Sequence, residues 1–132
     1  MDLRIRPATI EDLDALVALE RLAFADPWSR DSLASELVAG RRRLPLVAYL
    51  GDRMVGVALV WVVADELHLV SLAVDPAHRR RGIAQALLDA VLASPEGQRA
   101  AIMTLEVRIS NEAAINLYRR NDFLDVAVRP RY

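Results

Sequence analysis

The chain has 132 residues, enough for one domain, and its 54% hydrophobic and 27% charged residues exclude a disordered or fibrous protein. The formal net charge of −1 gives no global field that would draw the chain to nucleic acid or to an anionic membrane. The absence of Cys excludes thiolate catalysis, and because all 17 basic residues are Arg, lysine Schiff bases are excluded as well. Only two His are present, too few for most metal sites, so we expect no metal.

The N-terminal residues carry no recognisable targeting segment. Asp2, Arg4 and Arg6 leave no room for the apolar core of a signal peptide. The longest apolar stretch, 54–64, is far shorter than the ~20 residues of a membrane span. We therefore expect a cytoplasmic protein in which 1–132 form a single domain.

Strands and helices alternate in the order expected from the apolar pattern. In chain order the expected elements are strand 3–7, helix 9–24, helix 29–39, strands 44–50, 53–63 and 66–74, helix 82–93, strand 101–109, helix 110–120 and strand 123–129. Thr9, Ser29 and Ser110 are typical helix caps, and Gly51-Asp52 is typical of a hairpin turn. The order β-α-α-β-β-β-α-β-α-β predicts an α/β domain with a mixed sheet.

The loop between strand 66–74 and helix 82–93 is the sharpest local feature. Asp75-Pro76 ends the strand, and the run 79–81 is all Arg and leads directly into Gly82. A helix N-terminus offers unpaired N–H groups, and Gly lets the backbone approach a bulky ligand closely. These features favour an anion site suited to a pyrophosphate, although a solvated Arg run before an ordinary helix explains the same residues.

The sequence of this loop resembles a known signature. LAVDP at 72–76, followed by RRRGIA at 79–84, is similar to the acyl-CoA signature Q/R-x-x-G-x-G/A of the GCN5-related N-acetyltransferases, the GNAT superfamily. The segments 20–29, 105–118 and 129–132 resemble E-x-x-x-F-x-x-P-W-S, L-E-V-R-x-S-N-x-x-A-x-x-L-Y and a shortened R-R-x-Y-Y of its RimI-like ribosomal-protein alanine N-acetyltransferases. The resemblance covers essentially the whole chain, and implies a mixed central sheet flanked by helices on both faces and acetyl-CoA as co-substrate.

The resemblance also assigns residues to the co-substrate. Backbone groups of Leu72, Ala73 and Val74 would pair with the pantetheine arm of acetyl-CoA as an added strand would. Asn111 would contact the same arm. The backbone amides that would hold the pyrophosphate are those of Arg80, Arg81, Gly82, Ile83, Ala84 and Gln85.

Glu106 and Tyr118 match the general base and the general acid of the family. An α-amino group has a pKa of about 8, so a base must remove its proton before it attacks a thioester at neutral pH. Tyr118 would protonate the leaving thiolate of CoA. From the residues alone, Glu106 on the polar face of its strand could be a solvated or Arg-paired side chain, and Tyr118 could be a core residue.

The acceptor would enter between the Phe24–Trp28 segment and the chain end near Tyr132. Phe24 and Trp28 would line the pocket, although packing between the first two helices explains them equally well. His68 could be a second base near the acceptor or a hydrogen-bonded core or rim residue.

His68 would share a strand face with Val70 and Leu72 if its strand is regular.

The sequence departs from the family pattern at two places. Asp122 stands where the family has Gly, and an Asp tolerates a left-handed turn there at modest cost. The chain stops at Tyr132, before the usual last strand, so we expect that strand of the family to be missing.

Two classes of function remain open. The first is an enzyme that transfers acetyl from acetyl-CoA directly to a protein N-terminal α-amine, since no Cys exists to carry it. By the resemblance the acceptor is the N-terminal alanine of a small-subunit ribosomal protein, while lysine side chains and small amines stay open. The second is a non-catalytic acyl-CoA-binding module, which the presence of Glu106 and Tyr118 disfavours. Net charge and few aromatic residues disfavour nucleic-acid binding, and the oligomeric state is left open.

Overall fold

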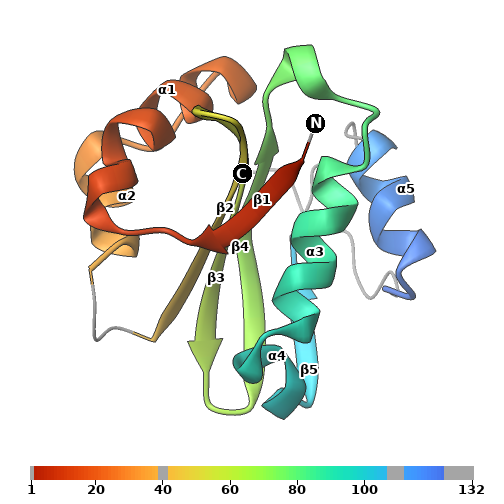
Figure 1. Cartoon of the computed structure of the whole chain (residues 1–132). Coiled ribbons are helices and arrows are strands. Elements are labelled where there is room, and N and C mark those ends of the chain that lie inside the picture. The colour runs from red at the N-terminus through yellow and green to blue at the C-terminus, as the bar shows by residue number, and fades with distance from the viewer. Residues whose placement is uncertain (1, 39–41, 107–111, 124–132) are drawn as a thin grey trace.

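The computed structural model describes residues 2–38, 42–106 and 112–123 (Figure 1). The strands are β1 (Leu3–Pro7), β2 (Arg43–Leu50), β3 (Arg53–Val63), β4 (Glu66–Val74) and β5 (Ile102–Leu105). The α-helices are α1 (Leu13–Ala23), α2 (Arg30–Glu36), α3 (Ile83–Ala93), α4 (Pro95–Arg99) and α5 (Glu112–Arg120), and short 3₁₀ turns span Ile10–Asp12 and Pro76–His78. No helix among these described residues is long and apolar enough to cross a bilayer.

The five strands form one mixed sheet in the order β1-β2-β3-β4-β5. Neighbouring strands are antiparallel except β4 and β5, which run parallel. Helices α1 and α2 cover one face, whereas α3 and α5 cover the other, as Figure 1 shows. This arrangement confirms the predicted α/β architecture with helices on both faces.

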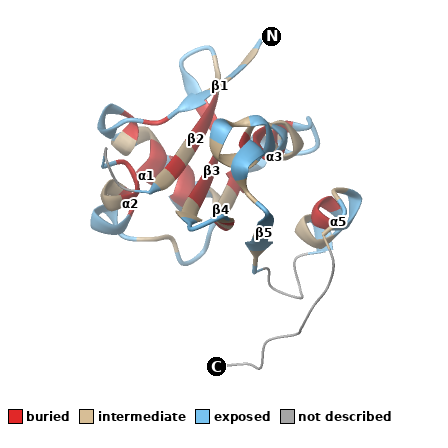
Figure 2. Cartoon of the chain, turned by 90° about the horizontal axis from the view of Figure 1, so that it is seen from below, coloured by how far each residue is buried: buried red, intermediate tan, exposed pale blue. Residues whose placement is uncertain are grey.

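Each face of the sheet has its own apolar core, and the buried residues gather where helices meet strands (Figure 2). On the first face α1 and α2 pack on β2 and β3 through Leu16, Val17, Leu19, Leu33, Val47, Val57 and Leu59. On the second face α3 and α5 pack through Ile83, Leu87, Leu88, Val91, Leu117 and Tyr118. A Cβ at Gly56 of β3 would lie 2.9 Å from side-chain atoms of both Ile83 and Leu87, so glycine there lets α3 approach the sheet closely.

The helix ends differ from the predicted ones for local reasons. Thr9 begins its helix as expected, but Asp12 folds back to accept a hydrogen bond from the Thr9 N–H at 2.8 Å, and the first turn is 3₁₀. Helix α2 ends at Glu36, before the predicted limit at 39. Helix α4, capped by the Ser94 hydroxyl, was not predicted because one turn leaves no periodic pattern.

The C-terminal elements are only partly described. The described part of β5 ends at Leu105, and Glu106 is not in a strand, while the remaining residues of the predicted strand, 107–109, lie outside the described ranges. Phe123 is not in a strand, and the rest of the predicted strand 123–129 lies outside them as well. Asp122 has φ 67, so it adopts the left-handed turn expected where the family has Gly.

Candidate active site

The sheet opens between β4 and β5. In the part of the chain that the structure describes, their pairing runs from Glu66–Ile102 to Leu69–Leu105, and β4 continues to Val74 paired with β3. Within the described residues, the β5-side edge of Val70–Val74 therefore has no strand partner. Extended backbone with open N–H and C=O groups is what a strand-like ligand requires. The candidate pantetheine residues Leu72, Ala73 and Val74 lie on this open edge.

A β-bulge at Val70 changes which side chains face which helix layer. Leu59 pairs with Ser71 and Val60 with Leu69, so Val70 is the extra residue. Val70 packs against the α1–α2 core, whereas Leu72 packs against the α3 core. The strand is therefore not regular, and the predicted face shared by His68, Val70 and Leu72 is wrong, since Leu72 points to the opposite side.

The turn after β4 is held by the buried carboxylate of Asp75. Its side chain, 4% exposed, accepts hydrogen bonds from the Ala77 N–H at 3.0 Å and from the Arg53 guanidinium at 2.8 and 3.1 Å. The Ala77 N–H and Arg53 lower the pKa of Asp75, so it stays charged. Its N–H donates to the Val55 carbonyl at 2.8 Å. The sequence marked Asp75 only as the end of a strand, because Arg53 is remote in the chain.

The α3 N-terminus that follows has the geometry of an anion site. Gly82 adopts a left-handed conformation with φ 77, and no atom lies within 4 Å of where its Cβ would be. The first intrahelical bond runs from the Ala86 N–H to the Gly82 carbonyl, which leaves the N–H groups of 83–85 without partners inside the helix. Left-handed Gly82 before helical Ile83 turns successive N–H groups toward one concavity. Arg79, Arg80 and Arg81 are exposed around it.

The side chain of Gln85, another predicted pyrophosphate residue, is already hydrogen-bonded within the fold. Its side-chain amide is paired with Asn121 at the end of α5 and with Asp89 one turn further along α3.

The two candidate acid–base residues have different surroundings. Glu106 is exposed and directly follows β5, at the point where the sheet opens. Tyr118 is 9% exposed in the α3–α5 core, with its ring edge-to-face on Phe123 at 5.7 Å. Burial raises the pKa of Tyr118 to about 12, so its phenol remains protonated at neutral pH. The candidates Asn111 and Tyr132 lie outside the described residues.

His68 lies at the closed end of the same opening. Its register partners are Trp61 on β3 and Thr104 on β5, and Thr104 directly precedes the last residue paired with β4. Its Nε2 atom is 3.1 Å from Glu66 Oε1, and both side chains are partly exposed. Because Leu67 and Leu69 belong to the α3 core, the intervening His68 faces the α1–α2 layer.

Phe24 and Trp28, the predicted pocket residues, differ in how far they are packed into the fold. Phe24 ends α1 and is 39% exposed. Trp28 packs against the α1–α2 core, directly before Ser29, whose hydroxyl caps α2 by accepting from the Ser32 N–H at 3.1 Å. Trp28 therefore packs on the core while remaining partly exposed, so packing does not exclude a ligand contact, and Phe24 is exposed.

Glu20 is a buried acid whose environment the sequence did not indicate. It belongs to the 20–29 motif, but its helical position gave no sign of burial. It is 1% exposed on α1, and neither carboxylate oxygen has a hydrogen-bond partner in the described structure. Desolvation raises its pKa to about 7.

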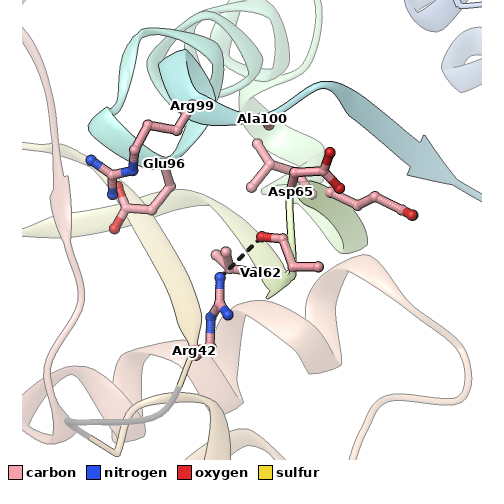
Figure 3. Close-up of a pocket in the computed structure, with 9 residues that line it drawn as sticks. Arg42, Val62, Asp65, Glu96, Arg99 and Ala100 are labelled. Carbon is pink, nitrogen blue, oxygen red and sulfur yellow. Dashed lines mark hydrogen bonds between the residues drawn. The ribbon is translucent and has the colours of Figure 1, made fainter.

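A small hollow lies at the other end of the sheet, near the start of β4 (Figure 3). It encloses about 60 Å³ between the β3–β4 turn and α4, and Arg42 donates to the Ala64 carbonyl across it at 3.1 Å. That volume is far below the ~300–1,000 Å³ of typical ligand pockets. Among the described residues, no group of three His, Asp or Glu side chains could hold a metal ion.

An open sheet edge that leads into an αL glycine and a helix N-terminus can hold a strand-like ligand with an anionic group, the pattern expected of an acyl-CoA site. The acetyltransferase (GNAT) family model matches residues 13–123. The chain belongs to this family, and it is an N-acetyltransferase that uses acetyl-CoA.

Known relatives agree with this assignment. The [ribosomal protein bS18]-alanine N-acetyltransferase of Escherichia coli K12 is 38% identical over 92% of this chain and 80% of its own. The crystal structure of the E. coli ribosomal-protein-S18-alanine N-acetyltransferase superposes with a TM-score of 0.91 at 36% identity, covering 99% of this chain and 83% of that one. The fold also matches a Thermoplasma acidophilum PaiA N-acetyltransferase solved with coenzyme A, with a TM-score of 0.80, 22% identity and 92% and 89% coverage.

Proposed function

We propose that this enzyme acetylates the N-terminal α-amine of a ribosomal protein, an N-terminal alanine as in the bS18 substrate of its E. coli relative. The observation that carries the proposal is the 38% identity to that relative over 92% of the chain. The opening between β4 and β5, with Glu106 at its edge, supports the same reaction. A ribosomal substrate in turn implies a cytoplasmic enzyme.

Acetyl-CoA binding is assigned to backbone groups. The open edge of Leu72–Val74 pairs with the amides of the pantetheine arm, and Asn111 contacts the same arm. The N–H groups of residues 80–85 bind the pyrophosphate, whose charge is favoured at the positive end of the α3 dipole. Open space above Gly82 leaves room for the phosphates. The exposed Arg side chains beside it add charge-assisted hydrogen bonds.

The reaction is one direct transfer between two bound substrates. Glu106 takes a proton from the acceptor ammonium, and the freed amine attacks the thioester carbonyl. The N–C bond forms, the C–S bond breaks, and the CoA thiolate receives the phenolic proton of Tyr118. The amine nitrogen then releases its second proton, which restores the Tyr118 phenol through solvent and leaves the neutral amide. At the pKa of about 12 that burial gives Tyr118, the phenol keeps its proton until the thiolate forms. On the acceptor side, we assign peptide contacts to Phe24, Trp28, His68 and Tyr132.

An acetylation assay with matched acceptors tests the acceptor class. The first arm is a peptide with a free N-terminal alanine, the second an N-terminally blocked peptide with lysine, and the third a polyamine. We expect turnover on the first arm alone. Faster acetylation of the lysine peptide or the polyamine would overturn the proposed acceptor.

The same preparation separates an enzyme from a binding module. Acetyl-CoA binding by calorimetry without turnover on any arm would show a non-catalytic module. Activity on the alanine peptide that disappears in Glu106→Gln would support both the acceptor and the base.

A further inference from the structure

The cofactor helix α3 and the Tyr118 helix α5 are joined by a pair of carboxamides. The Gln85 Nε2 atom donates to Asn121 Oδ1 at 2.8 Å, and the Asn121 Nδ2 atom donates back to Gln85 Oε1 at 2.9 Å. The remaining donor of each amide is also used, because Gln85 donates to Asp89 at 2.9 Å and Asn121 to the Leu117 carbonyl at 2.8 Å. All four N–H donors of the pair therefore have an acceptor.

Each amide lies one turn from a residue to which we assigned a role. Gln85 is in the first turn of α3, just after Gly82, and its own N–H belongs to the proposed pyrophosphate site. Asn121 directly follows α5, and its backbone N–H donates to the Tyr118 carbonyl at 3.0 Å. Asn121 thus closes the turn that carries Tyr118, while its side chain contacts the turn that binds the co-substrate.

A reciprocal amide pair fixes geometry more strictly than apolar contact does. Leu117 and Tyr118 already pack α5 on the α3 core, but apolar surfaces tolerate sliding and rotation. Two antiparallel N–H···O bonds between planar groups hold only at one rotation and one offset of the helices. Replacing both partners by apolar groups of like shape can leave stability unchanged, so stability alone does not account for such a pair.

We propose that the Gln85–Asn121 amide pair is a positioning device that holds α5, and with it the Tyr118 side chain, in register with the cofactor-binding turn of α3. The inference rests on the proposed roles of Tyr118 and of the Gly82 turn. Gln85 and Asn121 touch neither substrate through their side chains, so they act through Tyr118.

The test measures the effect of Asn121→Ala on turnover in the wild-type protein and in the Tyr118→Phe variant. Both assays use saturating acetyl-CoA and a peptide with an N-terminal alanine. Asn121→Ala should lower kcat about tenfold, the equivalent of the three side-chain hydrogen bonds that it removes, each at the lower end of the usual contribution. The KM for acetyl-CoA should change much less. In the Tyr118→Phe background the same substitution should cost nothing further, because the group being positioned is gone.

Rescue and control variants complete the experiment. The reciprocal exchange Gln85→Asn with Asn121→Gln keeps the summed side-chain length and should recover most of kcat. Asn116→Ala, at an exposed position on the same helix, should leave kcat unchanged. Thermal melts report whether each variant folds.

Three outcomes would overturn the inference: equal kcat losses in both backgrounds, no recovery in the exchange, or a lower Tm with unchanged kcat. Failure of the proposed function gives a different result, because the wild type would then not acetylate the alanine peptide. Failure of the proposed role of Tyr118 is distinguished as well, because Tyr118→Phe alone would turn over at the wild-type rate.

Discussion

At the residue scale, the proposed chemistry depends on two side chains with opposite environments. Tyr118 is buried and its pKa of about 12 lies well above the ~8.5 of a free thiol, so the phenol is a weak acid toward a thiolate. The proton transfer from Tyr118 to the thiolate is therefore unfavourable by itself and should add less to the rate than the step at Glu106. Glu106, exposed where β5 ends, can meet an acceptor that arrives from solvent. The larger catalytic effect is therefore expected at Glu106.

Glu106→Gln should lower kcat at pH 7 by roughly 10²–10⁴-fold, the usual range for losing a general base, because the amide keeps the shape and cannot take a proton. The deficit should shrink as pH rises above about 8, where solvent supplies the free amine. A pH–rate profile beside wild type measures both effects. Wild-type turnover at pH 7 would instead point to His68, and His68→Ala in the same assay would identify it.

The sequence predicted the roles of some single residues and not of others, depending on how far apart in the chain the interacting residues are. Gly82 was assigned from its immediate neighbours, and the structure shows the left-handed turn that such an assignment needs. Asp75 is held by Arg53, and Gln85 by Asn121, across long separations. Local patterns carry no signal for such pairs, because only the folded sheet brings the partners together.

At the element scale, strands were predicted better than helix ends. The bounds of β3 and β4 match the prediction to the residue, because two faces packed by separate helix layers leave a long apolar pattern. The bulge at Val70 was missed, since it is set by the register with β3 rather than by residue type. It also returned Leu72 to the α3 face, so only His68 and Val70 share the predicted face.

The turn before α3 offers a test of the cofactor site. Gly82→Val should weaken acetyl-CoA binding roughly 10–100-fold, the equivalent of about 1.5–3 kcal/mol for hydrogen bonds to a charged group. The new side chain would occupy the open space where the phosphates are expected. Calorimetric titration with acetyl-CoA measures the affinity.

Backbone strain needs its own control in that experiment, because any L-residue at φ 77 costs about 1–2 kcal/mol. Gly51 in the β2–β3 turn has φ 59 and equally open space. Gly51→Val should therefore lower Tm by a similar amount and leave acetyl-CoA affinity intact. Equal loss of affinity in both variants would remove Gly82 from the site.

The α1–α2 connection offers a second test at this scale. Phe24→Ala should raise the peptide KM about tenfold, equivalent to about 1.4 kcal/mol, without lowering Tm, because the ring is substantially exposed. Trp28→Ala should lower Tm as well, because its ring packs on the α1–α2 core. Steady-state kinetics and melts of both variants measure this. A matching rise in the KM for acetyl-CoA would assign Phe24 to packing.

At the scale of the whole molecule, the buried acids Asp12 and Glu20 make the free energy of unfolding depend on pH in opposite directions. Asp12 accepts two hydrogen bonds from Arg6, one from Tyr49 and one from the Thr9 N–H. The Arg6 bonds are the main reason that its pKa falls to about 2. Its stabilisation is present above the unfolded pKa of 3.8 and is lost as pH falls through about 2. Glu20 has no such partners, and burial raises its pKa to about 7.

Because folded Glu20 holds a proton, the free energy of unfolding decreases as pH rises. Between the unfolded pKa of 4.5 and the folded value of about 7, the folded state holds a proton that the unfolded chain has released. The free energy of unfolding therefore falls through this window, by up to about 3 kcal/mol. Glu20→Gln stays neutral at every pH and keeps the shape, so it should be more stable than wild type at pH 8 and equal to it near pH 4. Asp12→Asn is the opposite control, because it should be less stable at pH 7 and approach wild type near pH 2. Denaturant melts across this range measure both differences, and a Glu20→Gln advantage that does not change with pH would show that burial does not raise the pKa of Glu20 in the fold.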